Sequence, residues 1–118
     1  MKTFFLSITA LLVIAFADDN KLAGRWQTKP APNGNITSAV FMPDGNFEAY
    51  INKKPFTTGK YELNNDIFSF TDNGCNGARG TYKLIFFSQN DSLRFETISD
   101  SCSDRKAGME RLIFGKVK

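Results

Sequence analysis

The stretch that decides the fold runs from Arg79 to Ser99 and reads RGTYKLIFFSQNDSLRFETIS. Apolar residues recur at every second position on both sides of its centre, which is the period of a half-buried β-strand. Gln89-Asn90-Asp91, between the two halves, is typical of a tight turn. The stretch therefore predicts an antiparallel hairpin with strands at 79–88 and 92–99. The alternating positions are Tyr82, Leu84 and Phe86 in the first half and Leu93, Phe95 and Thr97 in the second.

Short β-type runs separated by turn residues continue outside this hairpin. Pro43-Asp44-Gly45 and Asn64-Asn65-Asp66 have the composition of tight turns. Residues 103–109 carry no β pattern, and we expect one helical turn there. The predicted strands lie at residues 24–29, 37–42, 46–53, 57–63, 67–72, 79–88, 92–99 and 110–117.

Eight consecutive strands joined by short turns predict an all-β fold, an eight-stranded antiparallel up-and-down β-barrel. Closing the meander into a barrel removes the two exposed edges that would otherwise pair with other chains. A two-sheet sandwich is the alternative arrangement, but it usually needs longer crossover loops than this chain contains. We therefore expect the barrel.

The chain begins with a pattern that is typical of a secretory signal peptide. Met1-Lys2 is followed by an apolar run that ends at Ala15-Phe16-Ala17. This run is shorter than the ~20 residues that span a bilayer. We expect residues 1–17 to be a signal peptide cleaved after Ala17, and residues 18–118 to form one domain without a membrane anchor. The protein is then secreted or periplasmic.

Cys75 and Cys102 are the only cysteines of the chain. An even number of cysteines in a small exported domain predicts a disulfide. In the predicted hairpin, position 78 lies opposite position 102, so both cysteines fall at the same end of the barrel. A bridge there would close the open base of the hairpin.

The composition argues against most enzyme chemistry. The sequence contains no histidine, which excludes Cys-His and Ser-His nucleophiles and leaves too few partners for a zinc site. Glu62 and Glu96 alternate with apolar neighbours and are predicted to point outward. We expect no catalytic residue, no metal, no cofactor and no enzymatic activity.

The charge of the chain does not favour a nucleic-acid or membrane partner. Lys and Arg number 15 against 12 Asp and Glu, and Lys2 leaves with the leader. The excess of positive charge is small and evenly spread, so it predicts no polyanionic partner. Asn35 and Asn90 begin N-glycosylation motifs, which matter only in a eukaryotic host.

Several short motifs resemble those of one family. Gly24-Arg25-Trp26 resembles the G-x-W signature on the first strand of lipocalins. Cys75 ahead of Gly80-Thr81-Tyr82, together with the later 100–105 segment DSCSDR, is similar to small secreted bacterial lipocalin-like (calycin) domains. The resemblance covers most of residues 18–118. It implies an eight-stranded barrel whose cavity takes a small hydrophobic molecule.

The chain departs from the lipocalin pattern at its C-terminal end. Lipocalins usually place an arginine at the end of the last strand, packed across the tryptophan. Here that place falls near Lys116 or Lys118. A lysine can supply the cation over the ring of Trp26.

The expected function follows from the barrel interior, for which two interpretations remain open. In the first, aromatic side chains line a pocket in which small residues such as Ala49 leave room. In the second, they fill the barrel. Arg79 and Arg105 flank the two cysteines and are candidates for holding an acidic head group at the rim. The candidate lining residues are Trp26, Phe47, Ala49, Tyr61, Phe68, Phe70, Tyr82 and Phe95.

The first interpretation predicts an exported carrier or scavenger of a small hydrophobic molecule. The second predicts a filled barrel that acts on a protein partner, as an interaction or inhibitor module, through its rim loops. The two interpretations differ in whether an apolar ligand enters the barrel.

Overall fold

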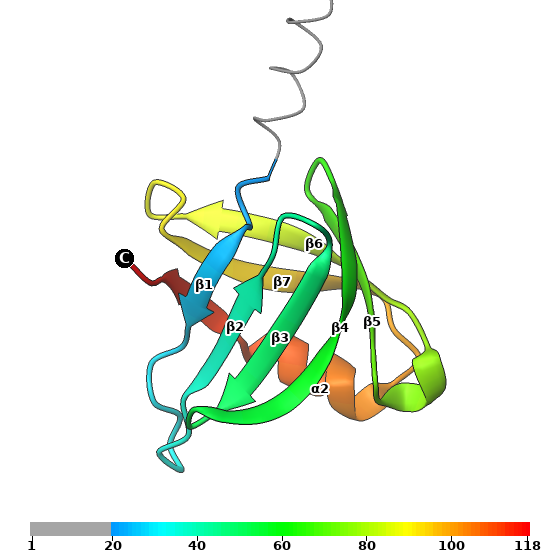
Figure 1. Cartoon of the computed structure of the whole chain (residues 1–118), viewed down its shortest axis with the longest axis horizontal. Coiled ribbons are helices and arrows are strands. Elements are labelled where there is room, and N and C mark those ends of the chain that lie inside the picture. Colours follow the sequence, from blue (N-terminus) through cyan, green and yellow to red (C-terminus); the bar gives the residue numbers. More distant parts are fainter. Residues whose placement is uncertain (1–19) are drawn as a thin grey trace, which may run out of the picture.

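The described part of the protein, residues 20–118 of a computed structural model, is a closed barrel of eight antiparallel strands (Figure 1). Each strand pairs with its neighbours in sequence, and β1 also pairs with β8, which closes the sheet. The predicted fold class is confirmed. The elements are β1 (Gly24–Gln27), β2 (Thr37–Phe41), β3 (Asn46–Ile51), β4 (Lys54–Asn64), β5 (Ile67–Asp72), the 3₁₀ turn η1 (Cys75–Gly77), β6 (Gly80–Phe87), β7 (Ser92–Ser99), α2 (Ser103–Arg111) and β8 (Ile113–Lys116).

The N-terminal leader falls outside this description. The signal peptide expected at residues 1–17, with cleavage after Ala17, lies outside the described residues, as do residues 18–19. Within residues 20–118, no helix has the length and apolar character needed to cross a membrane.

The β6–β7 hairpin has the register that its alternation predicts. Leu84 pairs with Phe95, and all of Tyr82, Leu84, Leu93 and Phe95 are buried. Near its base the register shifts, so that Tyr82 lies opposite Thr97. A bulge of this kind strengthens the local twist, which helps a sheet to close.

The β3–β4 connection differs from the prediction of strands at 46–53 and 57–63. Ile51 pairs with Lys54, so only Asn52 and Lys53 form the turn. Both have positive φ angles, 54° and 70°, as a two-residue hairpin of type I′ requires. Strand β4 therefore begins at Lys54, and the register shift after Ala49 makes room for the residues around Phe56.

The C-terminal end of the chain also differs from the prediction. Residues 103–111 form a nine-residue helix, α2, where one turn was expected, and β8 starts at Ile113 instead of residue 110. Most of its residues are exposed, and those that pack against the barrel include the charged Arg105, so it has no continuous apolar stripe that the sequence could display. Asp104 in its first turn and Arg111 in its last complement the helix dipole. The ends of the remaining predicted strands agree to within two residues.

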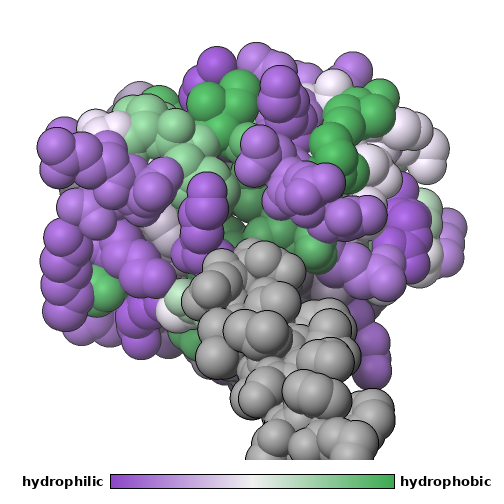
Figure 2. All heavy atoms as spheres, turned by 90° about the horizontal axis from the view of Figure 1, so that it is seen from above, coloured by the Kyte–Doolittle hydropathy of each residue, from purple (hydrophilic) through white to green (hydrophobic). Residues whose placement is uncertain are grey.

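The core of the barrel is built around β1 and the strands near it. Leu22, just before β1, Trp26 in β1, Leu84 in β6 and Leu93 in β7 are at most 2% exposed. Trp26 Nε1 donates a hydrogen bond to the carbonyl of Leu22 at 2.8 Å. Lys116 Nζ lies 5.0 Å from the centre of the Trp26 ring, so the cation expected from the last strand is this lysine. Seen from above, hydrophilic residues dominate the upper end of the molecule in Figure 1, with hydrophobic groups in separate patches (Figure 2).

The lower end of the barrel carries loops and a helix. The β1–β2 loop, the β3–β4 turn and α2 gather there, opposite the start of β1 (Figure 1). The disulfide between Cys75 and Cys102 joins the segment before β6 to the start of α2. This end of the barrel is therefore framed by loops and braced by the disulfide.

Candidate ligand-binding site

A pocket, here called the cup, opens at the lower end of the barrel. Its interior wall comes from β2, β3, β5, β7 and β8, and its rim from the β1–β2 loop, the start of β4, the segment after β5 and α2. A shallow extension runs over the outside of the barrel to Phe87, Ser88 and Ser92 at the β6–β7 turn. Apolar side chains dominate the interior. The inward-facing residues among those that line the cup are Thr37, Ala39, Phe41, Phe47, Ala49, Ile51, Phe68, Phe70, Phe95 and Phe114.

Small residues explain why the barrel is hollow here. Ala39 pairs with Ala49, and Ala49 pairs with Thr57, so three adjacent strands carry short side chains at one level. Above that level the rings of Phe41 and Phe68 pack edge to face, with centroids 5.8 Å apart. These rings form the floor of the cup, and the alanines leave the space beneath them.

The predicted lining residues divide into two groups. Five of the eight, Phe47, Ala49, Phe68, Phe70 and Phe95, line the cup. Trp26, Tyr61 and Tyr82 do not; they are buried in the core, Trp26 and Tyr82 completely. Tyr61 donates a hydrogen bond to the carbonyl of Met42 at 2.6 Å, which holds it at the upper end. The four phenylalanines of the first group are themselves at most 6% exposed, so their rings close the inner end of the cup and Ala49 is the more open position. Tyr82 lies behind the wall of the cup, where its hydroxyl donates to Asp100.

A polar network forms one side of the cup. Arg105 Nε and Nη2 donate to the two oxygens of Asp100, each at 2.9 Å. Arg105 Nη2 also donates to the carbonyl of Ala78 at 2.9 Å, and Nη1 lies 3.4 Å from Asp72 Oδ1. The guanidinium stacks 4.8 Å from the centre of the Phe70 ring. Arg105 thus ties α2 to β5 and to the segment before β6.

Asp100 is the centre of this network. Its side chain is fully buried, and it accepts hydrogen bonds from the Tyr82 hydroxyl and the backbone N–H of Cys102 as well as from Arg105. Burial opposes its ionisation, but the hydrogen bonds from Arg105, Tyr82 and Cys102 outweigh burial and hold the pKa of Asp100 below its ordinary value. Burial, followed by the hydrogen bond to Asp100, raises the pKa of Tyr82. The hydrogen bonds to Asp100 raise the pKa of Arg105.

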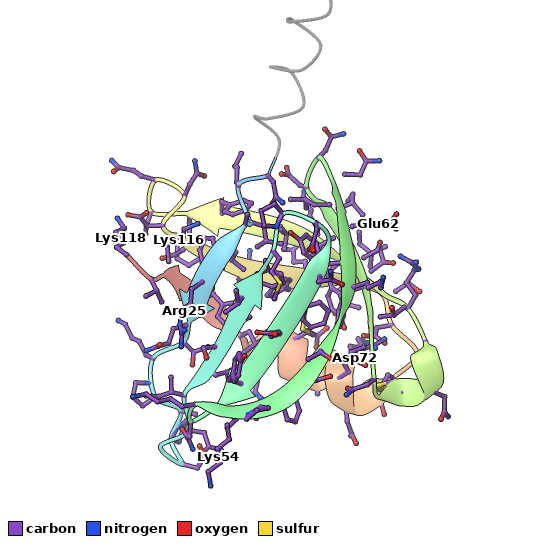
Figure 3. The ribbon with its side chains drawn as sticks, in the orientation of Figure 1. Arg25, Lys54, Glu62, Asp72, Lys116 and Lys118 are labelled. Atoms are coloured by element: carbon purple, nitrogen blue, oxygen red, sulfur yellow. A yellow bond between two sulfur atoms is a disulfide. The ribbon has the colours of Figure 1, made fainter. Side chains whose placement is uncertain are left out.

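The two rim arginines have different surroundings. Arg79 forms an exposed salt bridge of 3.1 Å with Glu62 on the outer face of β4, where Figure 3 shows Glu62 directed away from the barrel. Arg105 is buried in its network, with only 8% of its side chain exposed. The two arginines therefore differ in exposure, and both have carboxylate partners within the chain.

The predicted disulfide is confirmed. Cys75 and Cys102 are bonded, with their Cα atoms 5.8 Å apart, and both line the rim of the cup. Cys75 and Asn76 have positive φ angles of 55° and 53°, which lets η1 turn sharply toward α2. The bridge fixes the wall of the cup from which Arg105 projects.

The outward direction predicted for Glu62 and Glu96 is also confirmed. Both side chains are exposed and pair with Arg79 and Arg94 respectively. Within residues 20–118, no group of three His, Cys, Asp or Glu side chains is arranged to hold a metal ion.

Sequence reasoning did not single out Asp72 or Ala39 as site residues. Asp72 ends β5 one alternation step beyond Phe70 and lines the cup next to α2, at the lower end of the barrel in Figure 3. The inward alternation Phe68, Phe70, Asp72 is the signal that could have found it. Ala39 could have been found from its alternation with Phe41.

The geometry defines the class of the protein: a closed, eight-stranded antiparallel barrel with a pocket at one end. No protein-family model matches the chain, and none of the curated proteins matches it.

Proposed function

We propose that this protein is an exported binding protein that holds a small apolar molecule in the cup. The observation that carries the proposal is the pocket at the lower end of the barrel, which reaches down to phenylalanine rings and is framed by loops. Concave sites lined by aromatic side chains with a few polar groups are the usual form of small-molecule sites. The phenylalanine rings that close the inner end of the cup leave such a ligand one direction of approach.

A lipocalin-like (calycin) relationship belongs to the same proposal. Gly24-Arg25-Trp26 lies on the first strand, and Lys116 covers the Trp26 ring from the last strand. This arrangement supports the resemblance carried by the sequence motifs. Export is supported by the leader pattern of residues 1–17 and by the disulfide, which persists in oxidising compartments.

The experiment is native mass spectrometry of the protein exported under its own leader, compared with the same sample after denaturation. We expect a stoichiometric extra mass that is lost on denaturation and that identifies the ligand. The denatured mass also reports cleavage after Ala17. A native mass without an adduct, together with no binding of apolar probes, would contradict the carrier and favour the filled-barrel module acting on a protein.

A matched pair of variants locates the ligand. Ala49→Phe places a ring inside the cup, and we expect it to abolish the adduct. Thr71→Phe places the same ring next to Phe70 but on the outer face, opposite the exposed Lys60, and it should keep the adduct. Equal adducts in both variants would place the ligand outside the cup.

A further inference from the structure

The chemistry of the cup wall extends the proposed function to a class of ligand. We propose that the ligand is an amphiphilic amine, whose apolar body lies against the phenylalanine rings and whose protonated amino group binds Asp72. This inference rests on the proposed function of the cup. It is carried by one carboxylate oxygen that faces the pocket without a partner.

Asp72 is only partly satisfied by the protein. Its side chain is 11% exposed, and it lines the cup. One oxygen, Oδ1, accepts from the backbone N–H of Gly74 at 3.0 Å and lies 3.4 Å from Arg105 Nη1. Among the described residues, the other oxygen, Oδ2, accepts no hydrogen bond. A largely buried carboxylate with a vacant oxygen favours a donor that carries positive charge.

Arg105 neutralises this carboxylate only in part, because its shorter bonds go to Asp100. Its Nε and Nη2 make two bonds of 2.9 Å to Asp100, whereas its contact to Asp72 is a single one of 3.4 Å. One guanidinium thus faces two carboxylates. The Arg105–Asp100 pair is neutral as a unit, and the negative charge of Asp72 is left in excess on the wall.

The remaining charges near the cup lie in solvent. Lys29, Asp104 and Arg111 also line the pocket, but all three are exposed. Solvent and salt screen exposed charges, so they contribute less to binding than a charge on the interior wall. Asp72 therefore dominates the electrostatic preference of the site for a ligand inside the cup.

The apolar part of the site suits the rest of such a ligand. Phe47 and Phe70 pack edge to face with centroids 5.7 Å apart, and Phe70 already carries a cation, Arg105, over its face. Ring faces next to a carboxylate attract an ammonium group further. A ligand carboxylate would instead meet Asp72 as a like charge, and a neutral ligand would leave Oδ2 without a charged partner.

The test compares three probes with the same eight-carbon chain, octylamine, octanol and octanoate. Their dissociation constants are measured by calorimetry on the exported protein at neutral pH and low salt, below aggregation of the probes. We expect octylamine to bind at least tenfold more tightly than octanol, and octanoate to bind most weakly. This ranking on the unaltered chain needs no variant.

Two substitutions assign the preference to a residue. Asp72→Asn keeps an oxygen for the Gly74 N–H, and we expect it to bring octylamine to the affinity of octanol. Asp66→Asn removes an exposed carboxylate in the β4–β5 turn, outside the pocket lining, and should keep the tenfold preference. Circular dichroism melting checks that both variants fold. If Asp72→Asn does not fold, the ranking of the three probes on the unaltered chain decides whether the inference holds.

The outcomes separate the two proposals. Octanol or octanoate binding as tightly as octylamine would overturn the amine inference and leave the apolar cup standing. A preference for octylamine that survives Asp72→Asn would also overturn it. No binding of any of the three would overturn the inference and the proposed function together.

Discussion

Gly59 is a position at which the barrel tolerates no side chain. A Cβ atom there would lie 2.0 Å from the carbonyl oxygen of Thr71 and 2.9 Å from the Phe47 ring. The carbonyl belongs to the backbone of the neighbouring strand, so it cannot swing away as a flexible side chain can. The glycine lets the Phe47 ring pack directly on β4 beside the cup.

Gly59→Ala should therefore destabilise the protein. We expect a loss of about 1–3 kcal/mol in the free energy of unfolding, as for overpacking of a core, measured by urea denaturation. The matched control is Gly108→Ala in α2, where no atom lies within 4 Å of the new Cβ. That variant should gain about 0.5–1 kcal/mol from helix propensity. A Gly59→Ala protein as stable as the parent would contradict the close approach of β4 and β5.

At the scale of elements, the disulfide joins η1 to α2 across the open base of the β6–β7 hairpin. Its two cysteines are 27 residues apart in sequence. Cross-linking them restricts the unfolded chain and holds the Arg105 side of the cup in place. The bridge therefore acts on both stability and the shape of the site.

Replacing both cysteines by serine should lower the free energy of unfolding by about 3.5 kcal/mol, the chain-entropy value for a loop of this length. Urea denaturation of the parent and the double variant measures the difference. The parent under reducing conditions is the control and should approach the variant. A change below about 1 kcal/mol in both would show that the bridge does not constrain the unfolded state.

The elements also show where sequence patterns suffice and where they do not. The hairpin at 79–99 was predictable because its alternation and its turn agree. The Asn52-Lys53 turn was missed because it lacks the glycine that usually marks a type I′ turn. Helix α2 was underestimated because most of its residues are polar and its barrel-facing side includes the charged Arg105 as well as Met109, so no apolar period reveals it.

Prediction of the site was limited because strand alternation gives the direction of a side chain but not its level along the barrel. Alternation tells which side chains point inward, and it found Phe47 and Phe70 as well as Trp26 and Tyr61. It does not tell at which level along the barrel the inward side chains meet. Trp26 and Tyr61 therefore could not be separated from the lining residues until the register of all strands was known.

At the scale of the whole molecule, the buried network around Asp100 makes the stability of the protein depend on pH. The pKa of Asp100 is lowered in the folded state, despite burial, by its hydrogen bonds, and the pKa of Tyr82 is raised by burial and by Asp100. The stability from Asp100 is complete above its unfolded pKa of about 4 and is lost as the pH falls below it. The stability from Tyr82 is complete below about pH 10 and is lost as the pH rises above it.

The free energy of unfolding should therefore decline on both sides of this window, below about pH 4 and above about pH 10. Urea denaturation across the pH range measures both declines. Asp100→Asn should be less stable at neutral pH, because it leaves the Arg105 charge buried without its main partner, and its acidic decline should be shallower. An acidic decline identical to that of the parent would assign the effect to other carboxylates.

The pairing of β1 with β8 also has a consequence for how the protein is made. The first and last strands are hydrogen-bonded neighbours, with Trp26 opposite Lys116. A chain that emerges from its N-terminus can form every strand pair except the two that involve β8 before residue 113 appears, so it cannot close. Until then β1 and β7 are open edges of the kind that recruit foreign strands. The barrel therefore closes only once residues 113–116 are available, and a chain in which they have not yet paired exposes two sheet edges at once.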